Sequence, residues 1–254
     1  MVDLFGKTTF ALNHSPLARG SVRIHGSRLY GFTFDRLLYL WLHRAGLMGR
    51  SGVQLIRTHV REGMTVLDVG ANVGVYTSLL SRIVGPHGHV LALEPDPDNW
   101  RALQKASTAN GWQNVELHQT AAADRKGQMS FARSSFNSGN HSLQSDPSRP
   151  GEEVVNVIRL DELLEGRKIN FIKIDVQGWE ASVLRGAEKV LREKSPLSML
   201  VELWPQGLQR NGSSAGEVLE LLESFSFRLL DPADGRPFGA PPTRGYQDVL
   251  AVRH

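Results

Sequence analysis

The stretch VLDVGANVGVY (residues 66–76) is the strongest indicator of fold in this 254-residue chain. Aliphatic residues lead to Asp68, Gly70 and Gly74 frame a short turn, and an apolar helical pattern follows. Because glycine has no Cβ, it allows a tight turn and a close approach of the backbone to a ligand. A strand that ends in such a turn before a helix is typical of α/β folds that bind ligands at the carboxyl ends of their strands.

The rest of the chain alternates between short β-rich runs and helical patterns. This alternation implies βαβ units and a mostly parallel sheet. Since only a loop separates the last two strands, they should pair antiparallel. We therefore expect a doubly wound, mostly parallel α/β sheet with an antiparallel edge strand. Strands are predicted at 65–70, 89–95, 115–122, 152–160, 169–176, 197–205, 225–231 and 247–253, and helices at 75–84, 97–111, 160–166, 179–193 and 216–225.

The first part of the chain has a different pattern. Residues 1–62 are expected to form a helical N-terminal segment that covers the site, ahead of one domain at 63–254. Helical periodicity is present at 34–47 and again at 51–61, where Ser51 is the expected N-cap.

The net charge of +3 is unevenly distributed, since residues 1–63 hold nine Lys and Arg but only three Asp and Glu. This basic excess suits an anionic partner such as nucleic acid or a membrane surface, or it is a solvated arginine-rich face. The absence of cysteine excludes disulfides and thiolate catalysis. No apolar run is long enough to span a bilayer and the N-terminus does not follow the order of a secretory signal, so a cytoplasmic protein is expected. The sequence does not indicate an oligomeric state.

Glu94 closes the second strand, 26 residues after Asp68, where an acid can hold a ribose diol. A dinucleotide fingerprint has the pattern G-x-G-x-x-G, but Asn72 stands at the second glycine position and no third glycine follows. The turn is therefore poorly suited to a pyrophosphate, which disfavours a nicotinamide enzyme. S-adenosylmethionine fits better, because an amino acid replaces the pyrophosphate and its ammonium can meet Asp68.

Five motifs resemble those of the FkbM family of S-adenosylmethionine-dependent methyltransferases. They occur in order as DVGANVG (68–74), LEPDP (93–97), LDELL (160–164), IKIDVQGWE (172–180) and LRGAEKVL (184–191). The resemblance covers roughly residues 60–252 and implies a class I, Rossmann-like methyltransferase fold. The cofactor-binding residues it implies are Asp68, Gly70, Ala71, Asn72, Gly74, Tyr76, Glu94, Pro95, Thr120, Ala121 and Asp175.

The segment IKIDVQGWE supplies the candidate catalytic residues. Methyl transfer to a hydroxyl requires an oriented acceptor and removal of its proton, and Asp175 is the candidate general base. Strand alternation puts Lys173 on the same side, where it would pair with Asp175 or orient the acceptor. The family usually carries Glu at the position of Gln177, and an amide replaces only part of the role of a carboxylate.

Four residues are candidates for contact with the acceptor, namely Gln177, Glu180, Glu202 and His141. His141 lies in the polar segment 134–151, whose length is typical of a lid or binding loop. Asp175 and Glu202 are oxygen ligands that suit Mg²⁺, but two acids do not define a metal site and none is predicted.

The sequence thus predicts an S-adenosylmethionine-dependent O-methyltransferase that acts on a hydroxyl of a small molecule, natural product or glycan. Two alternatives stay open. One is an RNA methyltransferase that uses the basic N-terminal segment as its electrostatic anchor. The other is a catalytically inactive cofactor-binding protein, which the presence of Gln177 motivates.

Overall fold

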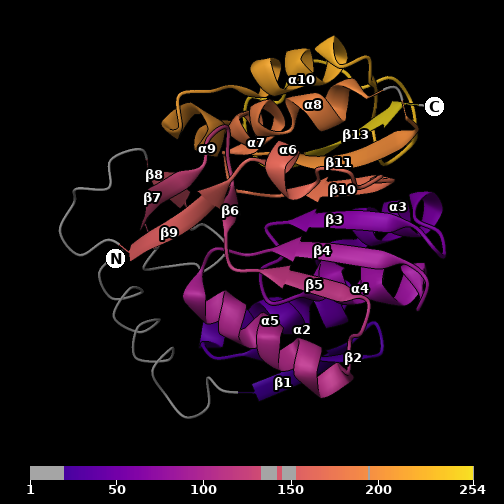
Figure 1. Cartoon of the computed structure of the whole chain (residues 1–254), viewed down its shortest axis with the longest axis vertical. Helices are drawn as coiled ribbons and strands as arrows, with labels where there is room; N and C mark the ends of the chain where they lie inside the picture. The colour runs from indigo at the N-terminus through magenta and orange to yellow at the C-terminus, as the bar shows by residue number, and fades with distance from the viewer. Residues whose placement is uncertain (1–19, 133–141, 145–152, 194, 254) are drawn as a thin grey trace.

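A seven-stranded sheet forms the centre of the computed structural model, which describes residues 20–132, 142–144, 153–193 and 195–253 (Figure 1). Neighbouring strands run parallel except where β13 pairs antiparallel with β11 and β12, so the predicted mostly parallel α/β sheet is confirmed. The antiparallel strand lies second from the edge rather than at it. Across the sheet the order is β12 (Arg228–Leu230), β13 (Gln247–Arg253), β11 (Leu197–Leu203), β10 (Phe171–Ile174), β3 (Thr65–Val69), β4 (His89–Leu93) and β5 (Val115–His118).

Helices cover both faces of this sheet (Figure 1). Successive strand residues point to opposite faces, so Val66 and Phe171 pack on one face while Leu67 and Ile172 pack on the other. The first face is covered by α3 (Arg50–His59) and α4 (Val75–Val84). The second face is covered by α6 (Leu160–Leu163), α7 (Glu180–Gly186), α8 (Glu188–Arg192) and α10 (Ala215–Ser224).

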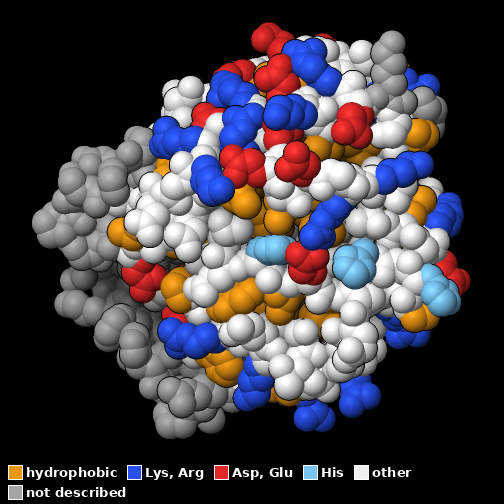
Figure 2. Space-filling view, in the orientation of Figure 1, with side chains coloured by type: hydrophobic (Ala, Val, Ile, Leu, Met, Phe, Trp, Pro, Cys, Tyr) orange, Lys and Arg blue, Asp and Glu red, His pale blue; other side chains and the backbone are white. Residues whose placement is uncertain are grey.

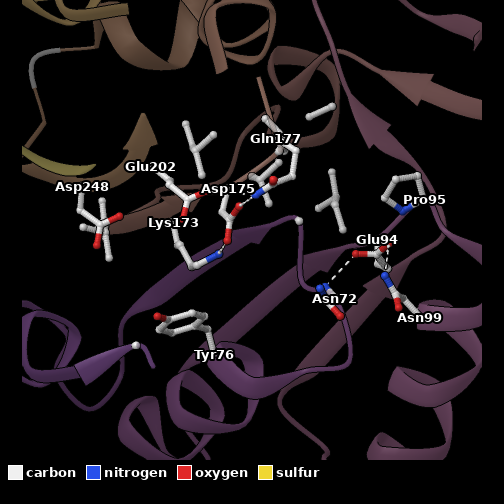
Figure 3. A pocket seen from close by; sticks show the side chains of 18 of the residues that line it. Asn72, Tyr76, Glu94, Pro95, Asn99, Lys173, Asp175, Gln177, Glu202 and Asp248 are labelled. Carbon is white, nitrogen blue, oxygen red and sulfur yellow. Dashed lines mark hydrogen bonds and ion pairs between the residues drawn. The ribbon is translucent and has the colours of Figure 1, made fainter. Parts of the chain in front are cut away.

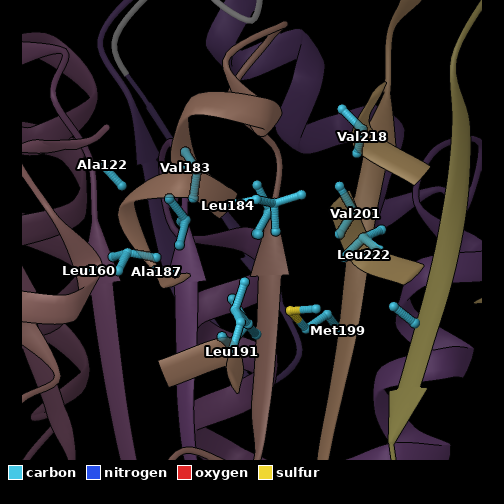
Figure 4. Close-up of a cluster of buried hydrophobic side chains, with 14 of the residues drawn as sticks. Ala122, Leu160, Val183, Leu184, Ala187, Leu191, Met199, Val201, Val218 and Leu222 are labelled. Atoms are coloured by element: carbon cyan, nitrogen blue, oxygen red, sulfur yellow. The ribbon is translucent and has the colours of Figure 1, made fainter. Parts of the chain in front are cut away.

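The cluster under α7, α8 and α10 fixes the strands that carry the site (Figure 4). Leu184 of α7, Val201 of β11 and Leu222 of α10 have no exposed surface. Burial of one such side chain stabilises the fold by about 1.5–3 kcal/mol. The ends of β10 and β11 are therefore held in place from this face.

The N-terminal segment is not purely helical, which corrects the expectation for residues 1–62. Before the helices α2 (Phe34–Arg44) and α3, the strands β1 (Gly20–Ile24) and β2 (Ser27–Gly31) form an antiparallel hairpin. His25 and Gly26 both have positive φ, 50° and 83°, as a two-residue hairpin turn requires. The alternating side chains Val22, Ile24 and Leu29 are buried, and this period-two pattern outweighs the helical one.

Two further elements differ from the sequence prediction. Helix α3 starts at Arg50 with Gly49 as N-cap at φ 69°, not at Ser51. The expected extra strand β9 (Glu153–Ile158) belongs to a separate small sheet with β6 (Ala121–Ala122), β7 (Gly127–Ala132) and β8 (Ser142–Gln144). The remaining helices are α5 (Pro97–Asn110), which packs against β2, and the short α9 (Pro205–Arg210).

Acidic and basic side chains are mixed over the helices α8 and α10 on the face seen in Figure 2. Ion pairs link them there, from Arg185 of α7 to Glu217 of α10 and from Arg192 to Glu188 within α8. Exposed pairs of this kind contribute little to stability, roughly 0–1 kcal/mol each. None of the described helices combines the length and the apolar content needed to cross a bilayer.

Candidate active site

A cavity of about 430 Å³ lies at the carboxyl ends of β4, β3, β10 and β11 and beside the first residues of β13. This volume is within the range of small-molecule sites, roughly 300–1,000 Å³. Figure 3 shows Glu94, Pro95 and Asn99 at one end and Lys173, Glu202 and Asp248 at the other. We call these the Glu94 end and the carboxylate end. Four strand spacings of about 4.8 Å separate β4 from β13, so Glu94 and Asp248 lie roughly 19 Å apart across the sheet, and Lys173 on β10 lies about half-way between them.

The glycine-rich turn brings two strands together between these ends. Gly70 has φ 83°, and a Cβ there would overlap the carbonyl oxygen of Asp175. Glycine is required at this position because the backbone after β3 touches the backbone after β10. The sequence predicted a close approach to a ligand, and the structure adds a close approach to the candidate catalytic segment. Gly74 begins α4 at φ 92°.

Asn72 has φ 52°, a left-handed conformation that Asn tolerates better than most residues. Its own side-chain Oδ1 accepts a hydrogen bond of 2.8 Å from the Val73 amide, and its backbone amide donates to Glu94 Oε2 at 2.7 Å. Asn at the second glycine position therefore fixes the turn onto the acid that ends the next strand.

Glu94 is 5% exposed and lines the cavity. Its carboxylate also accepts from the Asp96 amide at 2.9 Å and from Asn99 Nδ2 at 3.4 Å. Burial raises the pKa of Glu94 to about 7, and the charge of Asp96 raises it further against these hydrogen bonds. A carboxylate held in this way at the cavity wall fits the two hydroxyls of an adenosine ribose, which donate hydrogen bonds.

Lys173 is the buried cation of the carboxylate end. Its Nζ lies 3.2 Å from Asp175 Oδ2, 3.9 Å from Asp68 Oδ1 and 4.7 Å from the centre of the Tyr76 ring. Burial acts to lower the pKa of Lys173, but the charges of Asp175 and Asp68 outweigh it and raise the pKa above its usual value. Lys173 therefore stays protonated and cannot serve as a general base.

Asp175 is held as a carboxylate by its neighbours. Burial acts to raise its pKa, but the Lys173 charge and hydrogen bonds from Gln177, Lys173 and Glu202 hold the pKa below its usual value. Gln177 donates from Nε2 to Asp175 Oδ1 at 2.8 Å and to Glu202 Oε2 at 3.0 Å, so one amide bridges both carboxyl groups. Gln177 does this from a left-handed backbone, at φ 54°.

Glu202 and Asp248 are direct partners across β11 and β13. Burial raises the pKa of Glu202 well above its usual value, and the charges of Asp175 and Asp248 raise it further. Burial and the Asp175 charge raise the pKa of Asp248 to about 6. Among the described residues, no group of three or more Asp, Glu and His side chains has the arrangement of a metal site.

Most predicted site residues meet at this cavity, but four lie behind its wall. Asp68 is fully buried and accepts from the Thr77 hydroxyl at 2.6 Å. Glu180 is fully buried at the start of α7 and accepts from the amides of Val176 and Gly178, so it holds the turn after β10 instead of facing the cavity. Ala71 and Gly74 shape the turn from outside the lining, and His141 lies outside the described residues. The cavity is lined by Gly70, Asn72, Tyr76, Glu94, Pro95, Thr120, Ala121, Lys173, Asp175, Gln177 and Glu202.

Sequence reasoning missed several lining residues. Asp248, the second residue of the last strand, was missed because its place beside Glu202 depends on the order β13–β11. Tyr39 and His43 reach the cavity from α2, and burial lowers the pKa of His43 to about 4, so that it is neutral. Tyr246 lines the same end and stacks on Trp204 with ring centres 5.5 Å apart.

The fold and this site define a class I methyltransferase. A candidate rRNA methylase from Clostridium thermocellum superposes with a TM-score of 0.51 over 80% of this chain and 94% of that chain, at 14% identity, which shows the shared fold. The FkbM methyltransferase domain matches residues 68–229, more than half of the chain. The chain belongs to the FkbM methyltransferase family, and its cofactor is S-adenosylmethionine.

Two curated relatives are similar along most of the domain. Hexuronic acid methyltransferase AglP of Haloferax volcanii is 26% identical over 165 residues, which cover 63% of this chain and 65% of that protein. The chain thus spans a little under two thirds of the length of AglP. Methyltransferase 1 of Beauveria bassiana is 26% identical over 211 residues, which cover 74% of this chain and 81% of that protein.

Proposed function

We propose that this chain transfers the methyl group of S-adenosylmethionine to a hydroxyl oxygen of a small molecule, natural product or glycan. The observation that carries the proposal is the group of carboxyls around Lys173 at the end of the cavity away from Glu94. Transfer to a hydroxyl releases a proton, and an acceptor oxygen at this end would meet a carboxylate within the same cavity. The name of the relative AglP supports a sugar as acceptor.

The two ends of the cavity indicate which residues would hold the cofactor. Glu94 would bind its ribose hydroxyls, and Gly70 and Asp175, which follow β3 and β10, would lie beside its methionine part. The bound cofactor supplies an electrophilic methyl group on a sulfonium. Glu202 and Asp248, on the next two strands, would face the acceptor.

The remaining roles are removal of the hydroxyl proton and orientation of the base that removes it. Asp175 is the proposed base for the hydroxyl proton, and it is fixed by the Lys173 ammonium and the Gln177 amide. Lys173 keeps its own proton and orients Asp175. A base whose pKa is below neutrality is ionised when the acceptor arrives, at the cost of weaker proton affinity. After product release, Asp175 returns the proton to solvent.

The proposal is tested by incubation of the purified chain with methyl-labelled S-adenosylmethionine and a pool of hydroxylated metabolites and glycans. We expect label in a product whose mass and carbon shift identify a methyl ether, and its loss with Asp175→Asn. Glu220→Gln, an exposed carboxylate on α10, is the matched control and should keep full activity. Label on nitrogen or carbon, or label found only in RNA, would contradict the proposal.

A further inference from the structure

The carboxylate end of the cavity holds the carboxyl groups of Asp175, Glu202 and Asp248 but, among the described residues, only one Lys or Arg side chain. The donors of Gln177 and Lys173 are already directed at Asp175 and Glu202. The side-chain Oε1 of Gln177 is buried and has no hydrogen-bond partner in the described part of the chain. A buried acceptor without a donor costs about 1–3 kcal/mol. A ligand that brings donors to this end would recover that free energy.

Asp248 is the second acceptor that lacks a donor. Its partly buried carboxylate lines the cavity next to Glu202, and none of the described residues donates a hydrogen bond to it. A carboxylate in such a place binds most strongly to a cationic donor, since charge-assisted hydrogen bonds are about twice as strong as neutral ones.

The charges around this end disfavour an acid. Lys173 is the one charged cation that lines the cavity within the described ranges, and it is committed to Asp175 and Asp68. His43 faces the same end in its neutral form. A carboxylate on the acceptor would therefore meet Asp248 without a free cation to balance it, and like charges brought together are costly.

We propose that the acceptor is a hydroxyl compound that carries an ammonium group, such as an amino sugar, and that Asp248 and the Gln177 carbonyl bind that ammonium. This inference rests on the proposed function and names its acceptor class. The stacked rings of Tyr246 and Trp204 add an apolar wall beside Asp248 on which a sugar ring can lie. The acceptor would thus differ in charge from the acid named for AglP.

The test uses three probes that differ in one substituent, namely methyl glucosaminide, methyl glucoside and methyl glucuronide. Binding to the full chain saturated with S-adenosylhomocysteine is measured by calorimetry and by saturation-transfer NMR. We expect the glucosaminide to bind roughly tenfold more tightly than the glucuronide, with the neutral glucoside between them. In Asp248→Asn this ratio should fall to within about twofold, while the affinity for S-adenosylhomocysteine stays within about twofold.

Glu220→Gln is the matched control and should keep the full preference. Tighter binding of the glucuronide, equal binding of all three probes (absence of binding included), or an unchanged preference in Asp248→Asn would overturn the inference. A large loss of S-adenosylhomocysteine affinity in Asp248→Asn would also overturn it, because Asp248 would then serve the cofactor. An O-methyl ether formed on an acidic compound would contradict the inference and leave the proposed function intact, whereas N-methylation would contradict the proposed function and with it this inference.

Discussion

The two ends of the cavity are built in different ways. At the Glu94 end, the acid is held by the backbone amides of Asn72, in the turn after β3, and of Asp96, two residues after Glu94. At the carboxylate end, the side chains come from β10, β11 and β13, which lie far apart in sequence. Gln177 joins Asp175 to Glu202, and Asp248 lies beside Glu202 through strand pairing. The end proposed for the cofactor is therefore held by backbone hydrogen bonds in two turns. The end proposed for the acceptor depends on which strands become neighbours in the sheet.

The largest expected effect is on turnover and comes from a substitution at the carboxylate end alone. Asp175→Asn should lower the turnover number by roughly 10²–10⁴-fold, the usual contribution of a general base. The affinity for S-adenosylhomocysteine should change little, because Glu94 is untouched. Turnover and calorimetric affinity are measured on protein whose fold is checked by circular dichroism, since Lys173 loses its nearest counter-charge. Equal losses in turnover and affinity would mean that Asp175 belongs to the cofactor site.

The next prediction concerns the contact between Gly70 and the Asp175 backbone, which lies between the two ends of the cavity. Gly70→Ala should destabilise the protein by about 3 kcal/mol or more, because the new Cβ overlaps the Asp175 carbonyl oxygen at a positive φ. Gly111→Ala is the matched control, since Gly111 has φ 61° with nothing within 4 Å of an added Cβ. Its cost should be about 1–2 kcal/mol, that of left-handed backbone alone. Urea unfolding measures both, and equal costs would refute the close approach at Gly70.

The role of the Glu94 end is tested by the pH dependence of cofactor affinity. Hydroxyls donate best to ionised Glu94, so cofactor affinity should rise about tenfold as pH passes upward through about 7. Glu94→Gln should bind about tenfold more weakly at pH 8 and show no such rise. In the free protein the raised pKa of Glu94 favours folding at low pH, and this contribution is lost as pH rises from 4.5 to about 7. A pH-independent affinity in the wild type would contradict the ribose assignment.

The smallest expected effect on stability is at Gln177, where one substitution removes the side-chain hydrogen bonds to Asp175 and Glu202 and also relieves the left-handed backbone. Gln177→Gly relieves the left-handed strain and should change the free energy of unfolding by less than about 1 kcal/mol. Turnover should still fall about tenfold, because Asp175 and Glu202 lose their shared donor. His25→Gly is the matched control, because it relieves a similar left-handed strain, at φ 50° in the hairpin turn, and it should leave turnover unchanged. Unchanged turnover in Gln177→Gly would restrict Gln177 to a structural role.

The Glu94 end was largely predictable from sequence because its signals are local. The strand–turn–helix around Gly70, the acid at Glu94 and helix α4 all lie where the pattern predicted them, with α4 at residues 75–84 as expected. At the carboxylate end, Lys173, Asp175 and Gln177 were predicted from their motif and Glu202 from the sequence around it, whereas Asp248 was not predicted.

The rest could not be predicted because it depends on which strands become neighbours. Asp248 reaches the site since β13 inserts between β12 and β11, an order that no local pattern encodes. Glu180 was assigned to the acceptor, but the first turn of α7 directs it to the amides of Val176 and Gly178. The hairpin at 20–31 was missed because its turn, His25–Gly26, was overlooked within a basic segment that otherwise forms helices.

The most direct test of the account is one calorimetric titration of S-adenosylhomocysteine into the wild type, Glu94→Gln and Asp175→Asn at pH 8. We expect Glu94→Gln to lose about tenfold in affinity and Asp175→Asn to stay within about twofold of the wild type. The reverse order, with Asp175→Asn the weaker binder, would contradict the division of the cavity into a cofactor end and an acceptor end.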